Sequence, residues 1–288
     1  MDVPWRWTRV GIRGGAARIK AAVAAGRLAT ALTETRALAT MPVHKLRGTD
    51  PNWTFERIMR DEAARGVRST FFVMAGHAHR ADGPAPEAYE HLRPRLVSTL
   101  LSGGAEVGLH ASYTAAEDEE RLAAEKRALE ALAGPVRGQR FHYLRADPIR
   151  NLAALERAGF GYDTSLGFAD ALGFRAGIMH PFRPWDLDRD RPLRLVEIPL
   201  AAMDVTLGEA RYLGVSARDA ERHLVGLVDR AAQLGGGFAV LWHGEWFNDR
   251  AFPGWGALYF RLVDAVRARG GVCVAAGELA EEADARLP

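Results

Sequence analysis

The sequence predicts an α/β protein built around a buried parallel sheet. Short apolar runs rich in β-branched and aromatic residues alternate with longer amphipathic segments along most of the chain. Runs such as 106–109 (EVGL) are too short and too apolar for a surface strand, so we expect helices on both faces of the sheet. The length of 288 residues suits one α/β barrel better than an open sheet.

Composition and charge exclude several classes of protein. With 48% hydrophobic and 26% charged residues, the chain is typical of a soluble protein with a sizeable core. The formal net charge of +2 is too small to indicate nucleic acid as a partner. A single cysteine, Cys273, excludes an internal disulfide, and its apolar surroundings predict a small core residue in a strand.

The sequence shows neither of the two patterns that indicate a membrane-spanning helix or a signal peptide. No run reaches the roughly 18 apolar residues that a membrane-spanning helix needs. The first ten residues, MDVPWRWTRV, lack the charged-then-apolar order of a signal peptide. We therefore expect no transmembrane segment and a cytoplasmic location, while the oligomeric state is left open.

Residues 1–50 are expected to pack on the barrel as part of one domain that spans 1–288. A loosely helical apolar stripe predicts a helix from about 11 to 38, and a connecting loop follows at 40–52. The helix is strongly basic. Its basic residues either contact an anionic lipid or polymer or, more commonly for such patterns, form a solvated face.

The other elements follow from the same local signals. Apolar β-rich runs predict strands at 67–74, 106–109, 138–143, 195–200 and 237–243 and around Cys273. Amphipathic segments predict helices at 53–65, 86–101, 115–132, 147–158, 216–234 and 254–269 and at the end of the chain. Ser112 or Thr114 is the expected N-cap of the helix at 115–132, and Ser216 with Asp219 opens the helix at 216–234. Residues 162–186 have no period, which is typical of a long functional loop or a large crossover.

Polar residues follow several of the expected strands. They are His110, Arg140, His142, Asp163 and His243. In α/β barrels the carboxyl ends of the strands form one rim, and active sites are built there. A histidine on that rim is a candidate metal ligand or acid/base. We therefore expect these side chains, His110 and His243 above all, to share one pocket.

Five motifs in this order resemble the polysaccharide deacetylase superfamily, and the resemblance covers nearly the whole chain. They are 69–73 (STFFV), 106–110 (EVGLH), 140–143 (RFHY), 161–168 with 173–177 (GYDTSLGF and GFRAG), and 241–243 (LWH). The similarity is to the NodB-homology or carbohydrate esterase family 4 group, in a bacterial branch. It implies a distorted (β/α) barrel with a divalent metal, usually zinc, that removes acetyl groups from N-acetylated sugars.

The resemblance also implies roles for individual residues. His110 matches a metal ligand, His243 matches the general acid, and Arg140 matches the arginine that orients the base. Asp2 is the candidate for the acidic residue of the first strand, which serves as general base and metal ligand. His142 is a possible additional ligand. In such a scheme the metal polarises the acetyl carbonyl while the histidine protonates the departing amine.

Four further residues are candidates for contact with the sugar. Trp242 and Trp246 offer aromatic faces beside His243, although aromatic residues at a strand end are as often part of a core. Asp163 and Arg175 belong to the motifs at 161–168 and 173–177.

The chain departs from the family pattern at two places. Thr114 stands four residues after His110, where the family has a second histidine, and a threonine is not a strong zinc ligand. Residues 1–5 resemble the segment after the family's first aspartate, so we expect most of the first strand to be missing or incomplete. A barrel without that strand exposes unpaired backbone groups on its neighbours. A version extended upstream by about ten residues, enough for a strand and its lead-in, is expected to melt at a higher temperature and release more acetate.

The predicted function is a metal-dependent deacetylase acting on an N-acetylated carbohydrate in a surface polysaccharide pathway. One alternative is a non-catalytic protein with the deacetylase fold that binds carbohydrate or serves as a scaffold. A second alternative is a metal-free glycoside hydrolase that uses two carboxylates such as Asp163 and Glu245. Metal content and sensitivity to a chelator distinguish the three.

Overall fold

The computed structural model describes residues 9–47, 49–77, 79–83 and 90–287, and its centre is a parallel sheet. The five strands follow the order β1-β2-β3-β4-β7, and every neighbouring pair is parallel. They are β1 (Thr70–Val73), β2 (Glu106–Ala111), β3 (Gly138–Phe141), β4 (Tyr162–Asp163) and β7 (Val196–Glu197). The predicted α/β fold with a buried parallel sheet is therefore confirmed.

Two smaller pairs of strands complete the β structure of the described residues. β8 (Leu200–Met203) pairs in parallel with β9 (Ala239–Leu241), and β5 (Trp185–Asp186) forms an antiparallel hairpin with β6 (Arg191–Pro192). Among the described residues β1 and β9 each pair with a single strand, so these strands do not close into a ring.

The strand expected around Cys273 does not form. Residues 271–275 are irregular, and no strand of the described chain pairs with them. A strand exists only where a neighbour accepts and donates its backbone hydrogen bonds, so an apolar sequence alone was not enough. Cys273 itself is a partly buried free thiol, and burial raises the pKa of that thiol.

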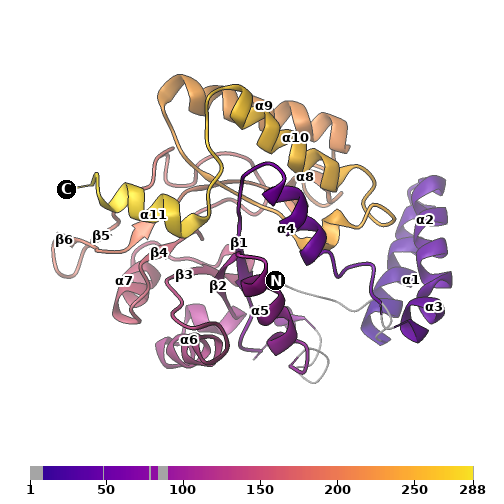
Figure 1. Cartoon of the computed structure of the whole chain (residues 1–288), viewed down its shortest axis with the longest axis horizontal. Coiled ribbons are helices and arrows are strands. Elements are labelled where there is room, and N and C mark those ends of the chain that lie inside the picture. Colours follow the sequence, from indigo (N-terminus) through magenta and orange to yellow (C-terminus); the bar gives the residue numbers. More distant parts are fainter. Residues whose placement is uncertain (1–8, 48, 78, 84–89, 288) are drawn as a thin grey trace.

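Helices cover the sheet, with α9 and α10 side by side on one side of it and α5 and α6 on the other (Figure 1). Their bounds are α4 (Phe55–Ala63), α5 (Arg93–Ser102), α6 (Glu119–Ala133), α7 (Arg150–Arg157), α8 (Asp204–Gly208), α9 (Ala217–Leu234), α10 (Trp255–Ala268) and α11 (Ala276–Asp284). The Ser216 hydroxyl caps α9 by accepting from the Asp219 amide at 3.2 Å, as predicted.

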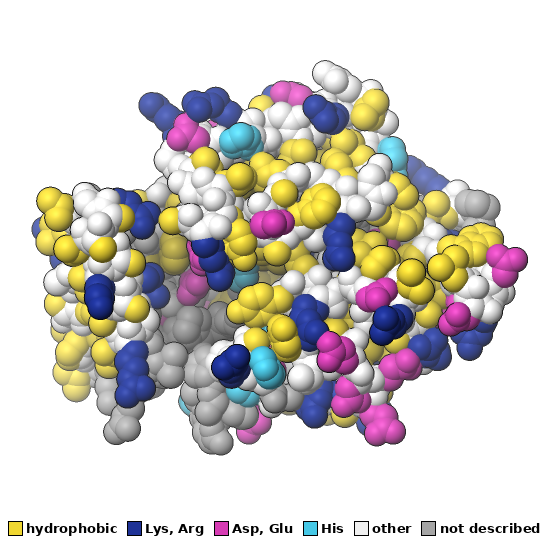
Figure 2. Space-filling view, turned by 180° about the vertical axis from the view of Figure 1, so that it is seen from behind, with side chains coloured by type: hydrophobic (Ala, Val, Ile, Leu, Met, Phe, Trp, Pro, Cys, Tyr) yellow, Lys and Arg dark blue, Asp and Glu magenta, His cyan; other side chains and the backbone are white. Residues whose placement is uncertain are grey.

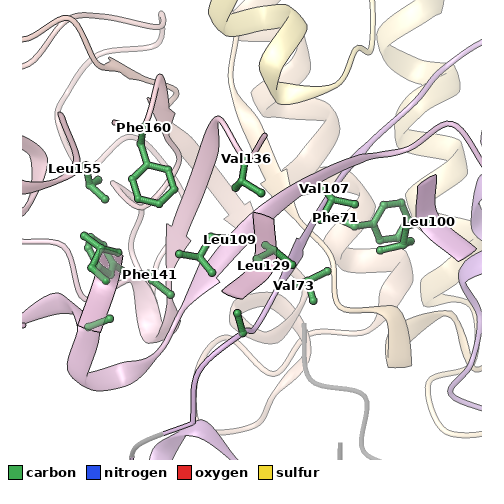
Figure 3. Packing of buried hydrophobic residues seen from close by; sticks show 14 of the residues in the cluster. Phe71, Val73, Leu100, Val107, Leu109, Leu129, Val136, Phe141, Leu155 and Phe160 are labelled. Atoms are coloured by element: carbon green, nitrogen blue, oxygen red, sulfur yellow. The ribbon is translucent and has the colours of Figure 1, made fainter. Parts of the chain in front are cut away.

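The main core lies between the strands and the helices α5, α6 and α7. Figure 3 shows Leu109 of β2 and Phe141 of β3 beside Leu129 of α6, and all three are fully buried. Removing such side chains from water is the main favourable contribution to folding, at about 1.5–3 kcal/mol for each. This core holds β1, β2 and β3 in place, and these strands carry part of the candidate site.

The single helix expected at 11–38 is wrong, because the chain folds there into a hairpin. α1 (Arg9–Ala24) packs on α2 (Leu28–Ala39), and a short α3 (Met41–Leu46) occupies the expected loop. Gly26 has φ +69°, a left-handed conformation that glycine adopts readily, and this ends α1 and reverses the chain. At Gly15 a Cβ would lie 2.8 Å from Leu38, so glycine also permits the close approach of α2. The hairpin lies to one side of the sheet (Figure 1).

Two other local expectations are corrected. The N-cap of α6 is Asp118, whose carboxylate accepts from the Arg121 amide, rather than Ser112 or Thr114. Ser112 instead hydrogen-bonds through its amide and hydroxyl to Glu125, and the residues after it form a 3₁₀ turn. In place of the single strand expected at 195–200, the chain forms β7 and then β8, which ends at Met203, where α8 begins.

No helix in the described part of the chain is both long enough and apolar enough to cross a membrane.

Truncating Leu109 to Ala is expected to destabilise the protein by about 2–5 kcal/mol, because the cavity left in this rigid core cannot collapse fully. Urea denaturation of both proteins measures the change in the free energy of unfolding. Leu132→Ala on the exposed side of α6 is the matched control, with an expected change within about 0.5 kcal/mol. Equal losses in the two variants would contradict the assignment of this core.

Candidate functional site

Four of the predicted site residues line one cavity of about 780 Å³. His110 lies near the end of β2, Arg140 lies in β3, and His243 follows β9. Trp242 lines the same cavity, and many of the other walls are apolar. The structure therefore brings together histidines that are more than a hundred residues apart in the sequence.

His243 is oriented by a buried carboxylate, that of Asp204. The Nδ1 atom of His243 lies 2.7 Å from Oδ1 of Asp204, and the His243 amide donates to Oδ2 at 2.5 Å. Asp204 is fully buried at the start of α8, whereas the His243 side chain is 30% exposed. With Nδ1 engaged by a carboxylate, Nε2 is the nitrogen that can exchange a proton with a bound molecule.

His110 and His142 lie beside each other, with ring centroids 5.0 Å apart. Nδ1 of His110 lies 3.0 Å from the carbonyl oxygen of Arg140, and Nδ1 of His142 lies 3.1 Å from Oδ1 of Asp82. A carbonyl oxygen only accepts, so Nδ1 of His110 carries the proton and Nε2 is the nitrogen able to bind a cation. In metal-binding histidines the ring nitrogen that does not bind the metal is typically hydrogen-bonded to an oxygen atom, as Nδ1 is in both of these rings.

Burial controls the charge of His110. Removal from water lowers the pKa of His110 well below its usual range, and the nearby charges of His142 and Arg140 lower it further. The ring is therefore neutral at neutral pH, which is the form that binds a metal.

Arg140 supplies a buried positive charge to the cavity. Its Nε donates to Oγ1 of Thr164 at 2.8 Å, and its guanidinium lies 4.5 Å from the centre of the Phe72 ring. Burial lowers the pKa of Arg140 to about 10, so the side chain keeps its charge at neutral pH. This charge can hold an anionic group at the cavity wall.

Asp163 lies inside the protein, which corrects its expected role in substrate binding. Its side chain is 0% exposed and accepts from Nε2 of Gln139 at 2.5 Å and from the hydroxyl of Ser165 at 2.7 Å. It adjoins Glu197, which is also fully buried. Burial and the neighbouring Asp163 raise the pKa of Glu197 well above its usual range, so the folded protein keeps a proton on Glu197 to a higher pH than the unfolded chain does.

Of the other three candidates for sugar contact, Trp242 alone lines the cavity. Trp246 is 2% exposed because it stacks on Phe252 at 4.3 Å and meets Trp255 edge to face at 4.6 Å. Trp246 therefore supports the segment after His243 from inside and has no face for a sugar. Arg175 is exposed on the irregular segment and does not line the cavity.

A group of aromatic side chains beside His142 was not predicted from the sequence. Tyr113 stacks on His79 with centroids 4.6 Å apart, and Tyr143 meets the Tyr113 ring at 5.9 Å. Tyr143 is more than half exposed and has φ +57°, a conformation that is costly for a residue other than glycine. Its ring lies 4.6 Å from that of His142. Such exposed rings are suited to packing against the apolar face of a sugar.

Two acidic residues of the site were also missed. Asp204 directly follows β8, and an acid at the end of a strand is the same signal that identified the other candidates. Asp82 ends a short 3₁₀ helix (Arg80–Asp82) and orients His142 while accepting from the amides of His79 and Tyr113. His79 is a local partner, three residues away, whereas Tyr113 and His142 come from distant parts of the chain. The role of Asp82 beside His142 therefore has no signal in the local sequence.

The described residues provide an incomplete set of metal ligands. A catalytic zinc takes three protein ligands, and within the described ranges there is no cluster of three or more His, Cys, Asp or Glu residues. His110 and His142 fit as two nitrogen donors. Asp2, the proposed third ligand and general base, lies outside the described residues. Thr114 Oγ1 is buried without a hydrogen-bond partner in the described part of the chain.

Comparison with solved structures assigns the fold. A candidate polysaccharide deacetylase from Mycobacterium smegmatis superposes with a TM-score of 0.61 at 19% sequence identity, over 94% of this chain and 86% of that one. The chain therefore has the fold of the polysaccharide deacetylases. A mutant of a CE4 family pseudoenzyme aligns over 81% of this chain and 64% of its own at 14% identity, with a TM-score of 0.42. The peptidoglycan deacetylase PdaC from Bacillus subtilis aligns over 81% and 86% at 14% identity, with a TM-score of 0.39. No family model and no curated protein matches the sequence.

Replacing Glu197 by Gln is expected to reduce the loss of stability as the pH rises. The unfolded chain releases this proton near pH 4.3, whereas the folded chain retains it up to the raised pKa, so folding is disfavoured progressively between the two values. The loss is at most about 1.4 kcal/mol per pH unit in that window. Gln holds no such proton and can still accept from the Leu166 amide.

Urea denaturation from about pH 5 to about pH 8 measures this effect as the difference between variant and parent. Glu120→Gln on the exposed face of α6 is the control and should follow the parent. A variant whose stability relative to the parent does not rise with pH would show that Glu197 is ionised in the folded protein.

Proposed function

We propose that this protein hydrolyses the amide bond of an N-acetylated carbohydrate and releases acetate. The pairing of His243 with Asp204 in a cavity shared with His110 and Arg140 is the observation that carries the proposal. A buried carboxylate that orients a partly exposed imidazole is typical of proton transfer sites. The polysaccharide deacetylase fold supports the same assignment.

His243 acts as the general acid in this proposal. Cleavage of an amide releases an amine, which is a poor leaving group unless its nitrogen is protonated. Nε2 of His243 delivers that proton, while Asp204 holds Nδ1 and keeps the ring in one orientation. The same carboxylate stabilises the imidazolium before transfer by its opposite charge.

Arg140 and Asp2 complete the proposed proton chemistry. We assign Asp2 the role of base toward the attacking water, on the basis of the sequence. Arg140 lies in the cavity wall with a retained positive charge, which is suited to orienting a carboxylate. The neighbouring Thr164 and Phe72 hold the guanidinium in place.

We propose a divalent metal, with zinc as the first candidate, held by His110, His142 and Asp2. When bound there, it would supply Lewis acidity toward the acetyl carbonyl. His110 is suited to this role because its ring is neutral and its Nδ1 is engaged by a carbonyl oxygen. The ring of His142 is fixed by Asp82 in the same way. Thr114 stands where the resemblance predicts a third histidine.

The substrate is proposed to be a carbohydrate chain rather than a single sugar. Tyr113 and Tyr143 form an aromatic surface beside His142, and Trp242 lines the cavity near His243. Aromatic faces on two sides of the site would hold sugar units on either side of the acetylated one. A surface polysaccharide pathway remains the proposed setting.

The second candidate function is a non-catalytic protein that binds carbohydrate. It is favoured by Thr114, and by the presence of only two suitable nitrogen donors among the described residues of the site. A glycoside hydrolase using Asp163 and Glu245 has less support, because Asp163 is fully buried and hydrogen-bonded to Gln139 and Ser165.

Substituting His243 by Ala is expected to lower acetate release by about 10²–10⁴-fold, since the leaving amine then has no proton donor. Asp204→Asn should also lower kcat, with little change in KM, because the His243 ring stays in the site but is no longer held in one orientation. The assay follows acetate released from N-acetylglucosamine oligosaccharides, with and without added zinc. His223→Ala, an exposed histidine of α9, is the matched control and should keep full activity.

Other outcomes of this assay separate the alternatives. Oligosaccharide binding without acetate release at any metal concentration would replace the hydrolase by the binding protein. Release of new reducing ends in the presence of a chelator would indicate a glycoside hydrolase. Unchanged acetate release by His243→Ala would remove His243 from the mechanism.

A further inference from the structure

The helical hairpin α1–α2–α3 differs in charge from the rest of the chain. Residues 9–47 contain eight Arg and Lys residues and one acidic residue, Glu34. Residues 49–287 contain 29 basic and 34 acidic residues. The formal net charge of +2 is therefore the sum over a basic hairpin and an acidic remainder of the chain. Such an asymmetry indicates that the hairpin meets an anionic partner.

The single acidic side chain of the hairpin does not reduce its surface charge. Glu34 is 3% exposed and lies 3.2 Å from Nε of Arg18, which belongs to the other helix. The exposed basic side chains include Arg13, Lys20 and Arg27, which are spaced seven residues apart along α1 and its end. Arg13 and Lys20 lie on one side of α1, since seven residues are close to two helical turns, and Arg27 lies in the turn that joins α1 to α2.

The same hairpin exposes large apolar side chains. They are 46–88% exposed and comprise Ile12 and Val23 of α1, Leu28 and Leu32 of α2, and Val43 and Leu46 of α3. Ile12 and Val23 are eleven residues apart and Leu28 and Leu32 are four apart, so each pair lies on one side of its helix. Figure 2 shows hydrophobic and basic side chains together over the hairpin, which lies on the left in that view. Apolar residues left in water in this number indicate an interaction surface.

We propose that the hairpin binds the surface of an anionic lipid bilayer and lies in its interface. An anionic polymer would match the basic residues but leave Leu28, Leu32 and Leu46 in water. A bilayer surface satisfies both, because lipid phosphates pair with Arg and Lys while apolar side chains enter the acyl boundary. This inference goes beyond the proposed hydrolase activity and does not depend on it.

The hairpin is connected to the segment that follows His243. The ring of His44 in α3 lies 3.4 Å from the guanidinium of Arg250, and Asn248 donates to Asn52 at 2.8 Å. Thr54 donates to the carbonyl of Gly244, the residue next to His243. Asn52 and Thr54 directly follow the hairpin, so these contacts fix the position of the hairpin relative to the segment after His243. Binding to a bilayer would therefore keep the site close to molecules carried on that surface.

Sedimentation of the full chain with lipid vesicles tests the proposal. The probe is a vesicle of about one third phosphatidylglycerol in phosphatidylcholine, compared with phosphatidylcholine alone. We expect binding to the anionic vesicles only, with an affinity that falls when salt is raised from about 0.05 M to about 0.5 M. Neutralising Lys20 and Arg27 together by Gln should weaken binding about 25-fold, at about fivefold per charge.

The apolar contribution is tested separately. Leu28→Ser with Leu32→Ser should weaken vesicle binding by about tenfold or more, because two side chains no longer enter the bilayer. Both leucines are exposed, so the melting temperature should not change. The matched controls are Leu187→Ser, at 62% exposure in the β5–β6 hairpin, and Arg222→Gln on α9. Neither control should alter binding.

Several results would overturn the proposal. One is equal binding to neutral and anionic vesicles, or none to either. Another is binding to an acidic polysaccharide or to DNA that survives the two serine substitutions, which would indicate an anionic polymer. A third is a dimer in light scattering that the serine substitutions convert to a monomer, which would assign the apolar face to a second copy of the chain.

Discussion

The register of the parallel sheet is the constraint on which the candidate site depends. β2 pairs with β3 so that His110 lies opposite Arg140, and this brings Nδ1 of His110 to the carbonyl of Arg140. The pairing of Met203 with Leu241 in β8 and β9 places Asp204 beside His243 by the same logic. A shift of one residue in either pair would turn these side chains to the opposite face. The core under β2 and β3 holds this register and therefore fixes the geometry of the candidate site.

The positive charge of Arg140 in the cavity wall is balanced by buried carboxyl groups of the sheet. Arg140 is buried, the acid pair Asp163 and Glu197 lies on the next two strands, and burial raises the pKa of Glu197. An unpaired charge in such a place would cost several kcal/mol, so hydrogen bonds from Gln139 and Ser165 satisfy Asp163. The pair thus balances the guanidinium electrostatically without providing a second accessible acid. Among the described residues of the site, His243 with its partner Asp204 therefore remains the candidate for proton transfer.

The basic hairpin (9–47) and the acidic α/β body (49–287) use their charged side chains differently. The α/β body is acidic overall and uses its polar residues inside hydrogen-bonded networks, as Asp82 and Asp204 illustrate. The basic hairpin keeps its charges on the outside, and it does so next to exposed leucines. The contact of His44 in α3 with Arg250 joins the two parts, and Asn52 and Thr54, which follow the hairpin, hydrogen-bond to the same segment after His243.

The sequence by itself determined the α/β class, the order of most helices and strands, and the positions of His110, Arg140 and His243 at strand ends. These follow from local periodicity and from the common rim of parallel strands. Only the tertiary structure decided that Asp204 and Asp82 orient two histidines, that Asp163 and Trp246 are buried, and that residues 271–275 form no strand. Each of these depends on partners distant in the chain, whose register and packing no local pattern contains. The turn at Gly26 lies between the two cases, because glycine permits a left-handed residue but the packing of α1 on α2 selects it.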